Sequence, residues 1–392
     1  IATTTNIYLT SDNLSGPIPP QIGDLTNLVE LKLRYNNLTG SIPLEIGNLT
    51  NLVHLELRGN NLTGSIPAEI GNLTNLVILD VGHNDLTGPI PPEIGSLSNL
   101  TQFNLTSNSG CGGNCSIPPE IGNLTNLTYL DFHNYDFTGP VPSSFENLVN
   151  ITTLWLSNNQ LTGDIPSGIQ NMTNIRHLRM NNNEFTGVIP SWLYNLTELQ
   201  RLEFGGNNIT GTISPDIGNL INLKHLWASS NQLTGSIPPE IGNLIQMDGW
   251  LVLYGNDFTG PIPPEIGNLT NLEKLFLSEN NLSGEIPSEI GNMESLTAIW
   301  LRNNQLSGQI PESICDLTNL NWEGSGWSAS LISGNYLCPP YPSCIADYMG
   351  NQACYTYVPD DNFEQALIDL GYDDLLDDSV MTANISVVTQ LN

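Results

Sequence analysis

A 24-residue repeat constrains this chain more than any other feature of its sequence. The pattern L-x-L-x-x-N-x-L begins at Ile7, recurs through Ile299 and ends in a degenerate copy near Ile332. A fixed period of roughly 20–50 residues indicates stacked units that share one continuous core. The repeat therefore replaces the separate domains of ~150 residues that a chain of 392 residues would otherwise suggest.

Each part of the repeat predicts a piece of structure. The L-x-L segment alternates with a period of about two residues, which predicts a short strand whose leucines face inward. The Asn that follows can satisfy backbone groups of neighbouring coils, because its amide both donates and accepts hydrogen bonds. The LTGxIP segment predicts a bend, and PPEIGNLTNL predicts a 3₁₀ or irregular turn. Asp12 and Tyr135 stand in the Asn position of their repeats, and short insertions lie at 111–115, 247–250 and 322–327.

The wording NLTGxIPxxIGNLTNL resembles the plant-specific class of leucine-rich repeats over roughly residues 1–344. That class includes the extracellular portions of plant receptor kinases and the polygalacturonase-inhibiting proteins. The resemblance implies a β-rich α/β solenoid: a right-handed superhelix of about 14 repeats with a concave parallel sheet, a second short sheet and a 3₁₀ or irregular convex side. Such a scaffold hosts many ligands, so the repeated letters do not by themselves specify a function.

The last part of the chain departs from the repeat. We expect residues 1–354 to form the solenoid with a disulfide-containing C-terminal cap, and residues 355–392 to form an acidic, helix-containing segment. In this segment Asp361 and Glu364 are expected to form a capping box, and Gly371 to end the helix. The segment resembles one that recurs between leucine-rich arrays in secreted proteins of marine Bacteroidetes. That resemblance implies a bacterial protein in which the segment is a cap or a linker to a further domain.

The cysteines indicate disulfides and therefore an oxidising compartment, so we expect a secreted or surface-displayed protein. They are Cys111, Cys115, Cys315, Cys338, Cys344 and Cys354. CGGNC predicts a small stapled loop closed by Cys111 and Cys115, whereas a zinc site would need paired Cys clusters that these spacings do not supply. The stretch LCPPYPSC at 337–344 resembles the C-terminal cap of the plant-specific class, which implies a disulfide between Cys338 and Cys344. The partners of the remaining cysteines stay open.

Charge argues against two classes of partner. The chain has 9 basic and 39 acidic residues, a formal net charge of -30. Nucleic acids and anionic membrane surfaces both attract basic proteins, so we expect neither as a partner. No stretch approaches the ~20 apolar residues of a membrane helix, so we expect no membrane insertion.

The variable positions beside the strand leucines are the candidate binding surface. They are expected to face solvent on the concave sheet, which at ~4.8 Å per strand extends for roughly 65 Å. All Lys, Arg and His residues fall in the strand segments, whereas the recurring Glu of PxEIG lies outside them. This distribution predicts a mixed, relatively cationic strip on an acidic molecule. Exposed Trp, Tyr and Arg are typical of binding hot spots, although aromatic residues also favour strands by propensity alone. The candidate ligand-binding residues are Tyr8, Lys32, Arg34, Tyr35, His54, Arg58, Tyr129, His133, Trp155, His177, Arg179, Arg201, Trp227, Trp250, Tyr254, Phe276, Trp300 and Arg302.

These observations predict a non-catalytic extracellular recognition module that binds a protein, a peptide or a polysaccharide on the concave face. No set of residues meets the requirements of a catalytic or metal site, so we expect no catalytic residue, metal or cofactor. The sequence does not specify the oligomeric state. One alternative is ice binding by the repeated threonines of LTG, which stack at ~4.8 Å, and another is a structural or adhesin spacer. Trp322 and Trp327 of the third insertion are expected to pack under the C-terminal cap.

Overall fold

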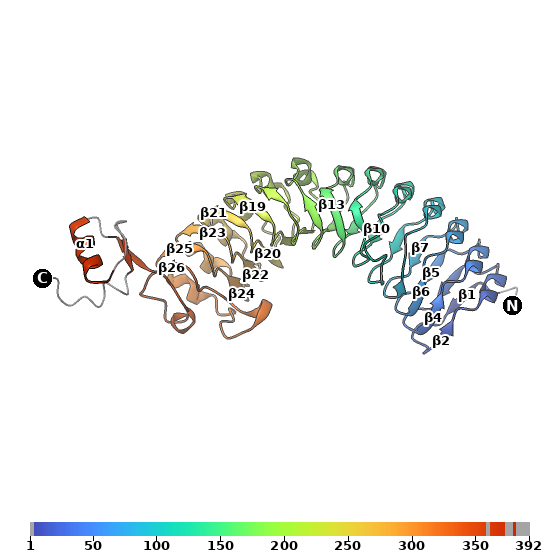
Figure 1. Cartoon of the computed structure of the whole chain (residues 1–392), viewed down its shortest axis with the longest axis horizontal. Helices are drawn as coiled ribbons and strands as arrows, with labels where there is room; N and C mark the ends of the chain where they lie inside the picture. The colour runs from blue at the N-terminus through green and yellow to red at the C-terminus, as the bar shows by residue number, and fades with distance from the viewer. Residues whose placement is uncertain (1–3, 358–360, 373–378, 382–392) are drawn as a thin grey trace. The chain divides into compact units, whose positions relative to one another are not determined.

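The computed structural model describes residues 4–357, 361–372 and 379–381. They divide into two compact units, residues 1–210 (the first unit) and residues 211–392 (the second unit). In both units each repeat adds one short strand to a parallel sheet and one 3₁₀ turn (Figure 1). Each unit is therefore built as a solenoid, as the repeat predicts.

The long sheet of the first unit follows the chain order of the repeats. Its parallel strands are β1 (Asn6–Tyr8), β3 (Glu30–Lys32), β5 (His54–Glu56), β7 (Ile78–Asp80), β9 (Gln102–Asn104), β10 (Tyr129–Asp131), β12 (Thr153–Trp155), β14 (His177–Arg179) and β16 (Arg201–Glu203). The register advances by one repeat at each step, so that Leu31 pairs with Leu55 and Leu55 pairs with Leu79. Equivalent residues of successive repeats therefore lie side by side.

The long sheet of the second unit continues the same pattern with the later repeats. Its strands are β18 (His225–Trp227), β20 (Trp250–Val252), β22 (Lys274–Phe276) and β24 (Ala298–Trp300). An isolated parallel bridge between Trp300 and Leu331 adds the degenerate last copy to this ladder.

The LTG segments form short second sheets, as expected. In the first unit they are β2 (Ser15–Pro17), β4 (Asn37–Ser41), β6 (Asn61–Gly64) and β8 (Asp85–Leu86), and then β11 (Thr138–Pro140), β13 (Gln160–Asp164) and β15 (Glu184–Thr186). A third group is β17 (Thr210–Gly211), β19 (Gln232–Gly235), β21 (Asp257–Gly260), β23 (Asn281–Gly284), β25 (Gln305–Gly308) and β26 (Tyr336–Leu337). The threonine column of the ice-binding alternative is thus interrupted at the insertion 111–115. Some of its hydroxyls also serve the backbone, as Thr234 Oγ1 donates to Gly211 O at 3.3 Å.

The PPEIGN-type segment of each repeat forms a 3₁₀ helix, which confirms the expected irregular side, and two further 3₁₀ helices lie in the third insertion and the cap. They are η1 (Pro20–Asp24), η2 (Leu44–Asn48), η3 (Ala68–Asn72), η4 (Pro92–Ser96), η5 (Pro119–Asn123), η6 (Ser143–Asn147), η7 (Ser167–Asn171), η8 (Ser191–Asn195), η9 (Pro215–Asn219), η10 (Pro239–Asn243), η11 (Pro264–Asn268), η12 (Ser288–Asn292), η13 (Glu312–Asp316), η14 (Gly326–Ser328) and η15 (Ala346–Tyr348). Coils approach closely here, because a Cβ on Gly47 would lie 2.6 Å from Glu69 O. Only glycine permits that spacing.

The recurring Asn holds neighbouring coils together through buried hydrogen bonds. Asn60 is 7% exposed, and its Oδ1 accepts from Leu38 N at 3.0 Å. Its Nδ2 donates to Leu33 O and to Leu57 O, each at 2.9 Å. Asn60 therefore serves backbone groups of its own coil and of the preceding one, as the repeat predicts.

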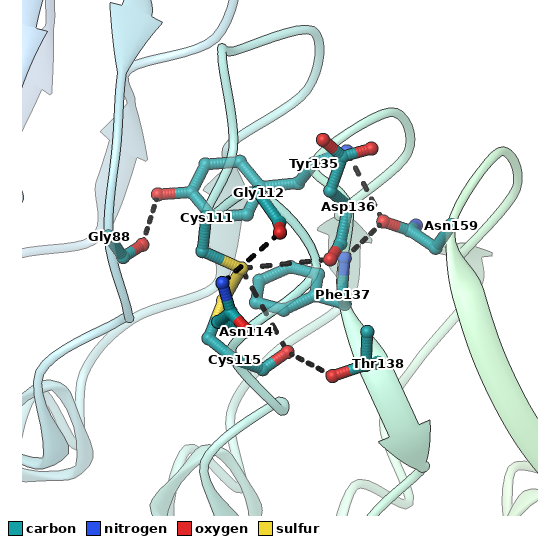
Figure 2. Close-up of a disulfide and its surroundings, with 10 residues drawn as sticks. All are labelled: Gly88, Cys111, Gly112, Asn114, Cys115, Tyr135, Asp136, Phe137, Thr138 and Asn159. Carbon is teal, nitrogen blue, oxygen red and sulfur yellow. Dashed lines mark hydrogen bonds between the residues drawn. A yellow bond between two sulfur atoms is a disulfide. The ribbon is translucent and has the colours of Figure 1, made fainter.

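The insertion 111–115 explains why a tyrosine replaces this Asn in one repeat. Cys111 and Cys115 form the expected disulfide, with their Cα atoms 5.9 Å apart. Figure 2 shows the Tyr135 ring reaching past this loop, where its hydroxyl donates to Gly88 O at 2.9 Å. The ring is 1% exposed and stacks on Phe137 with centroids 4.7 Å apart. Tyr135 thus fills the wider coil that the extra residues create, and burial raises its pKa to about 12.

The C-terminal cap corrects one expected disulfide. Cys338 bonds to Cys354 and Cys344 bonds to Cys315, so Cys338 and Cys344 are not partners. Three prolines at 339, 340 and 342 restrict the backbone between these two cysteines and oppose a tight ring. Cys344 instead reaches back to η13 of the preceding coil, and Cys338 reaches forward. No free cysteine remains among the described residues.

The segment after the cap contains the expected helix, α1 (Asp361–Asp369). A short antiparallel pair, β27 (Tyr355–Tyr357) and β28 (Ser379–Met381), accompanies it. Leu367 is buried with Val380, and Gly371 follows the helix with a φ of 77°. The side chains of the predicted capping box lie outside the residues that the structure describes.

Replacing Asn60 by Ala tests the role of the Asn ladder, the set of recurring buried asparagines that join neighbouring coils. The change removes three hydrogen bonds and leaves buried backbone groups unsatisfied, so we expect a loss of about 2–4 kcal/mol in the free energy of unfolding. Urea denaturation followed by circular dichroism measures it. The exposed neighbour Asn61 provides the matched control, and Asn61→Ala should change the midpoint little. Equal midpoints for the two variants would contradict this role.

Candidate ligand-binding face

The register of the first unit builds one continuous column of variable side chains. Each strand contributes the residue that follows its central inward-facing residue, and these residues are paired from strand to strand. This central column is Tyr8, Lys32, Glu56, Asp80, Asn104, Asp131, Trp155, Arg179 and Glu203. We call these residues and their flanking side chains on the same surface the polar strand face.

One end of the polar strand face is an ion-pair network around Glu56. Glu56 is 2% exposed, and it pairs with Arg34 and, at 3.5 Å, with Lys32 Nζ. Lys32 Nζ also lies 2.6 Å from Glu30 Oε2, and His54 Nδ1 lies 3.2 Å from the same oxygen. The hydrogen bond from Lys32 holds the pKa of Glu30 below its ordinary value. The charges of these side chains therefore offset one another, although the buried Arg34 Nε has no hydrogen-bond partner.

The middle of the face contains a chain of three side chains that superficially suggests catalysis. His133 Nδ1 lies 2.8 Å from Asp131 Oδ1, and Thr106 Oγ1 lies 2.7 Å from His133 Nδ1 and 2.8 Å from its Nε2. Thr106 is only 1% exposed, however, so its hydroxyl is not accessible to a substrate. Tyr129 also donates to Asp131 at 3.0 Å, and burial raises the Tyr129 pKa. The arrangement therefore holds a buried carboxylate in place.

The other end of the face surrounds Glu203, which is 4% exposed. Arg201 Nη1 lies 2.9 Å from its Oε1, and Arg179 Nε lies 3.4 Å from its Oε2. Asn181 Nδ2 donates to Oε2 at 3.2 Å. Arg179 also lies over the Trp155 ring, with its guanidinium carbon 4.4 Å from the ring centroid.

Asp80 is the exception among these buried carboxylates. It is 9% exposed, and none of the ion pairs within the described residues includes it. Burial raises its pKa above the ordinary value, against the influence of the more distant Arg58. It lines a hollow of about 230 Å³ together with Arg34, Asn104 and Tyr129.

This face is mixed, because its cations lie beside buried carboxylates. Carboxylates occupy the central column itself, where they pair with the cations at either end. They could have been found by reading the third residue of each strand down the repeats, from Glu56 to Glu203. The remaining predicted residues here differ in exposure: Tyr8 and Tyr35 are 56% and 55% exposed, while burial lowers the pKa of His177.

The predicted aromatic residues of the second unit do come together, but they are covered. We call Trp227, Trp250, Tyr254, Phe276 and Trp300 the aromatic cluster. Phe276 is 0% exposed, stacks on Trp300 with centroids 4.0 Å apart and also contacts Trp327, so it is covered in this structure. Trp327 of the third insertion lies against the cluster instead of under the cap. Trp322 does lie against the cap, stacked on Tyr348.

The other surfaces of the described residues are weaker candidates for a binding or catalytic site. A wide groove of about 950 Å³ runs along the 3₁₀ side and is lined by Gly, Asn and Thr of the repeat. Arg302 pairs with Glu279 at 2.9 Å on the second unit. No group of three His, Cys, Asp or Glu side chains among the described residues could hold a metal ion. In the described part of the chain, no helix has the length and apolar character needed to cross a membrane.

The sequence profile of the Leucine Rich Repeat family matches much of the chain. The matched residues are 27–49, 51–73, 75–97, 126–148, 198–220, 222–244, 250–269, 271–293 and 295–317, and a two-copy Leucine Rich repeats profile matches 149–195. The chain is a leucine-rich-repeat protein. No curated protein matches its sequence.

Solved structures of leucine-rich-repeat proteins resemble this chain closely. The plant peptide hormone receptor RGFR1 in complex with RGF2 is 38% identical with a TM-score of 0.80, over 86% of this chain and 52% of the receptor. The Arabidopsis receptor kinase HAESA, in complex with the peptide hormone IDA and the co-receptor SERK1, is 32% identical with a TM-score of 0.67, over 88% of this chain and 65% of that one. A leucine-rich-repeat protein of Leptospira interrogans is 31% identical with a TM-score of 0.59, over 86% of this chain and 92% of that one.

This leucine-rich-repeat chain spans about half the length of the first receptor that it matches, 52%. The matched fold is that of receptor and recognition proteins, which agrees with the expectation of a non-catalytic chain.

Two substitutions compare Asp80, which belongs to no described ion pair, with Glu56, which does. The raised pKa means that the folded chain binds the Asp80 proton more tightly than the unfolded chain does. Stability from this group is therefore present below its ordinary pKa and is lost as pH rises through the raised pKa. Asp80→Asn should raise the urea midpoint at pH ~7, and the gain should vanish at acidic pH.

Glu56→Gln should act in the opposite direction. It removes a carboxylate that two cations contact, so we expect a loss of about 1–3 kcal/mol at neutral pH. Urea midpoints measured across pH for both variants compare the two sites. A loss of stability in Asp80→Asn equal to that in Glu56→Gln would contradict the assignment of Asp80 as unpaired.

Proposed function

We propose that the chain is an extracellular recognition module that binds an extended peptide segment, carrying a basic side chain, on the polar strand face. Asp80 is the observation that carries this proposal. It is a buried carboxylate that lines a hollow and belongs to no described ion pair, unlike Glu56 and Glu203. A Lys or Arg of the ligand would supply the missing counter-charge, because a buried charge is costly unless it is paired.

The dimensions of the central column suit a short peptide. From Glu56 to Trp155 there are four register steps. At ~4.8 Å per step they span roughly 19 Å, the length of about six extended residues. Trp155 lies toward the far end and is half-buried, with Arg179 over its ring. It offers an apolar anchor of the kind that dominates binding energy in protein interfaces.

The charge of the whole chain favours a cationic ligand. The formal net charge of -30 produces a field that attracts basic peptides and speeds their encounter with the protein. That attraction is screened by salt, so binding should weaken as ionic strength rises.

The similar structures support a peptide ligand over a polysaccharide. RGFR1 and HAESA were both solved with peptide hormones. The disulfides support a secreted or surface location, because such bonds persist in oxidising compartments. We also propose that residues 355–392 are a cap or linker distinct from the solenoid.

A binding screen with matched variants tests the peptide proposal. The purified chain is applied to arrays of basic and neutral peptides and to a glycan array, and the tightest hit is then titrated. Asp80→Asn should lower the affinity for a basic peptide by at least about tenfold, or ~1.4 kcal/mol. Trp155→Ala should also weaken it.

Glu93 provides the control for Asp80. It lies in η4 of the same repeat and is exposed, so Glu93→Gln makes the same charge change away from the face. Trp192→Ala in η8 is the matching control for Trp155. A glycan hit, or a peptide hit that Asp80→Asn leaves unchanged, would contradict the proposal.

A further inference from the structure

The aromatic cluster of the second unit has a feature that its repeats do not explain: one side chain from outside the repeat pattern occupies it. Trp327 comes from the insertion at 322–327, and its ring lies near the rings of the whole cluster. The centroid distances are 5.3 Å to Trp227, 6.1 Å to Trp250, 6.3 Å to Tyr254, 5.4 Å to Phe276 and 5.7 Å to Trp300. Trp327 nevertheless remains 38% exposed.

The cluster surrounds this indole and does not merely stack on it. The interplanar angles are 63° with Trp227, 61° with Phe276 and 43° with Trp300. Such edge and tilted contacts are favourable between aromatic rings, because the edge of one ring meets the face of another. A sugar ring would be better served by one flat, open aromatic surface. The contacts therefore match an aromatic side chain.

The insertion presents Trp327 on a short, lightly held loop. Ser330 N donates to Asn321 O at 2.6 Å at the base of the loop, and Trp300 Nε1 donates to Ala329 O at 2.8 Å. Between Trp322 and Trp327 the sequence EGSG supplies no apolar side chain. The other hydrogen bonds at this end of the loop are local, from Ser328 Oγ to Ser325 O at 3.0 Å and from Ala329 N to Gly326 O at 3.2 Å. Few buried contacts and exposed backbone are the properties of segments that open locally at low free-energy cost.

The neighbouring tryptophan of the same loop behaves differently. Trp322 stacks on Tyr348 with ring centroids 6.3 Å apart, and Tyr348 donates to Glu323 at 3.0 Å. The Cys315–Cys344 disulfide encloses the whole insertion. The loop is thus tied at its base and beside the cap, while Trp327 alone reaches from it into the aromatic cluster.

We propose that the aromatic cluster is a binding site for an aromatic side chain of a partner protein, and that Trp327 occupies this site in the unliganded chain. A partner that inserts a Trp, Phe or Tyr displaces Trp327 and makes the same contacts. The loop then acts as an internal competitor, and the apparent affinity equals the intrinsic affinity multiplied by the fraction of chains in which the site is open. The site is separate from the polar strand face and does not depend on the peptide proposed to bind there.

A peptide copy of the loop tests whether the site accepts an aromatic ligand in trans. The probe is the labelled peptide EGSGWSAS, which is residues 323–330, and the protein is the full chain with Trp327→Ala. Fluorescence anisotropy should show saturable binding at least about tenfold tighter than to the unmodified chain, because the competitor is gone. The same peptide with Ala in place of Trp should not bind.

Matched variants identify the site. Trp322→Ala changes the other indole of the loop and should leave binding as weak as in the unmodified chain. Adding Trp300→Ala to Trp327→Ala should abolish binding by removing one wall of the cluster. Asp80→Asn should have no effect here, which separates this result from that for the polar strand face.

The variant Trp327→Phe allows the proposal to be tested even if Trp327→Ala does not fold. Phenylalanine retains a ring in the cluster but fills it less completely, so the peptide should bind with an affinity between those of the other two chains. A folded Trp327→Ala chain that does not bind the peptide, or that binds the Ala peptide equally well, would overturn the proposal. So would a glycan that occupies the cluster and excludes the peptide.

Discussion

Hydrogen bonding between coils by buried asparagines is the interaction on which the rest of the structure depends. Each such Asn, as Asn60 shows, satisfies backbone groups of two successive coils and is itself almost inaccessible to water. The inward leucines can then stack in register, and the strands follow at a fixed spacing. Because that spacing is fixed, each variable position forms a column along the sheet. The binding specificity of such a protein must therefore come from the residues in these columns and from insertions that contact them.

The two units use this freedom in different ways. In the first unit, charged side chains fill the central column and most carboxylates have partners within the chain. Glu56 and Glu203 are each held by two cations, and such pairs gain little beyond offsetting their own desolvation. Asp80 lacks a partner of this kind, which makes it the position where a ligand cation has most to contribute. In the second unit, aromatic rings occupy the equivalent strand positions and Trp327 covers them.

The repeat predicts the strands, the 3₁₀ turns and the role of the Asn ladder because each depends on residues within one or two coils. It cannot predict the partner of Cys338, since that depends on where the chain runs after the last regular coil. The position of Trp327 was missed for a similar reason: an insertion without periodicity has no template that specifies its path. The buried carboxylates could have been found, because Glu56, Asp80 and Asp131 share one column. These carboxylates are not apparent when the variable residues are grouped by residue type. They become apparent when the residues are grouped by their position in the strand.

The repeated residues build the coils, and we propose that the polar strand face of the first unit recognises the ligand. Hydrogen–deuterium exchange of the full chain, with and without the tightest-binding basic peptide, tests this most directly. We predict that bound peptide slows exchange in the long-sheet strands β5, β7, β9, β10 and β12 and leaves η2 through η6 unchanged. Protection confined to the 3₁₀ side or to the second sheets would contradict the account.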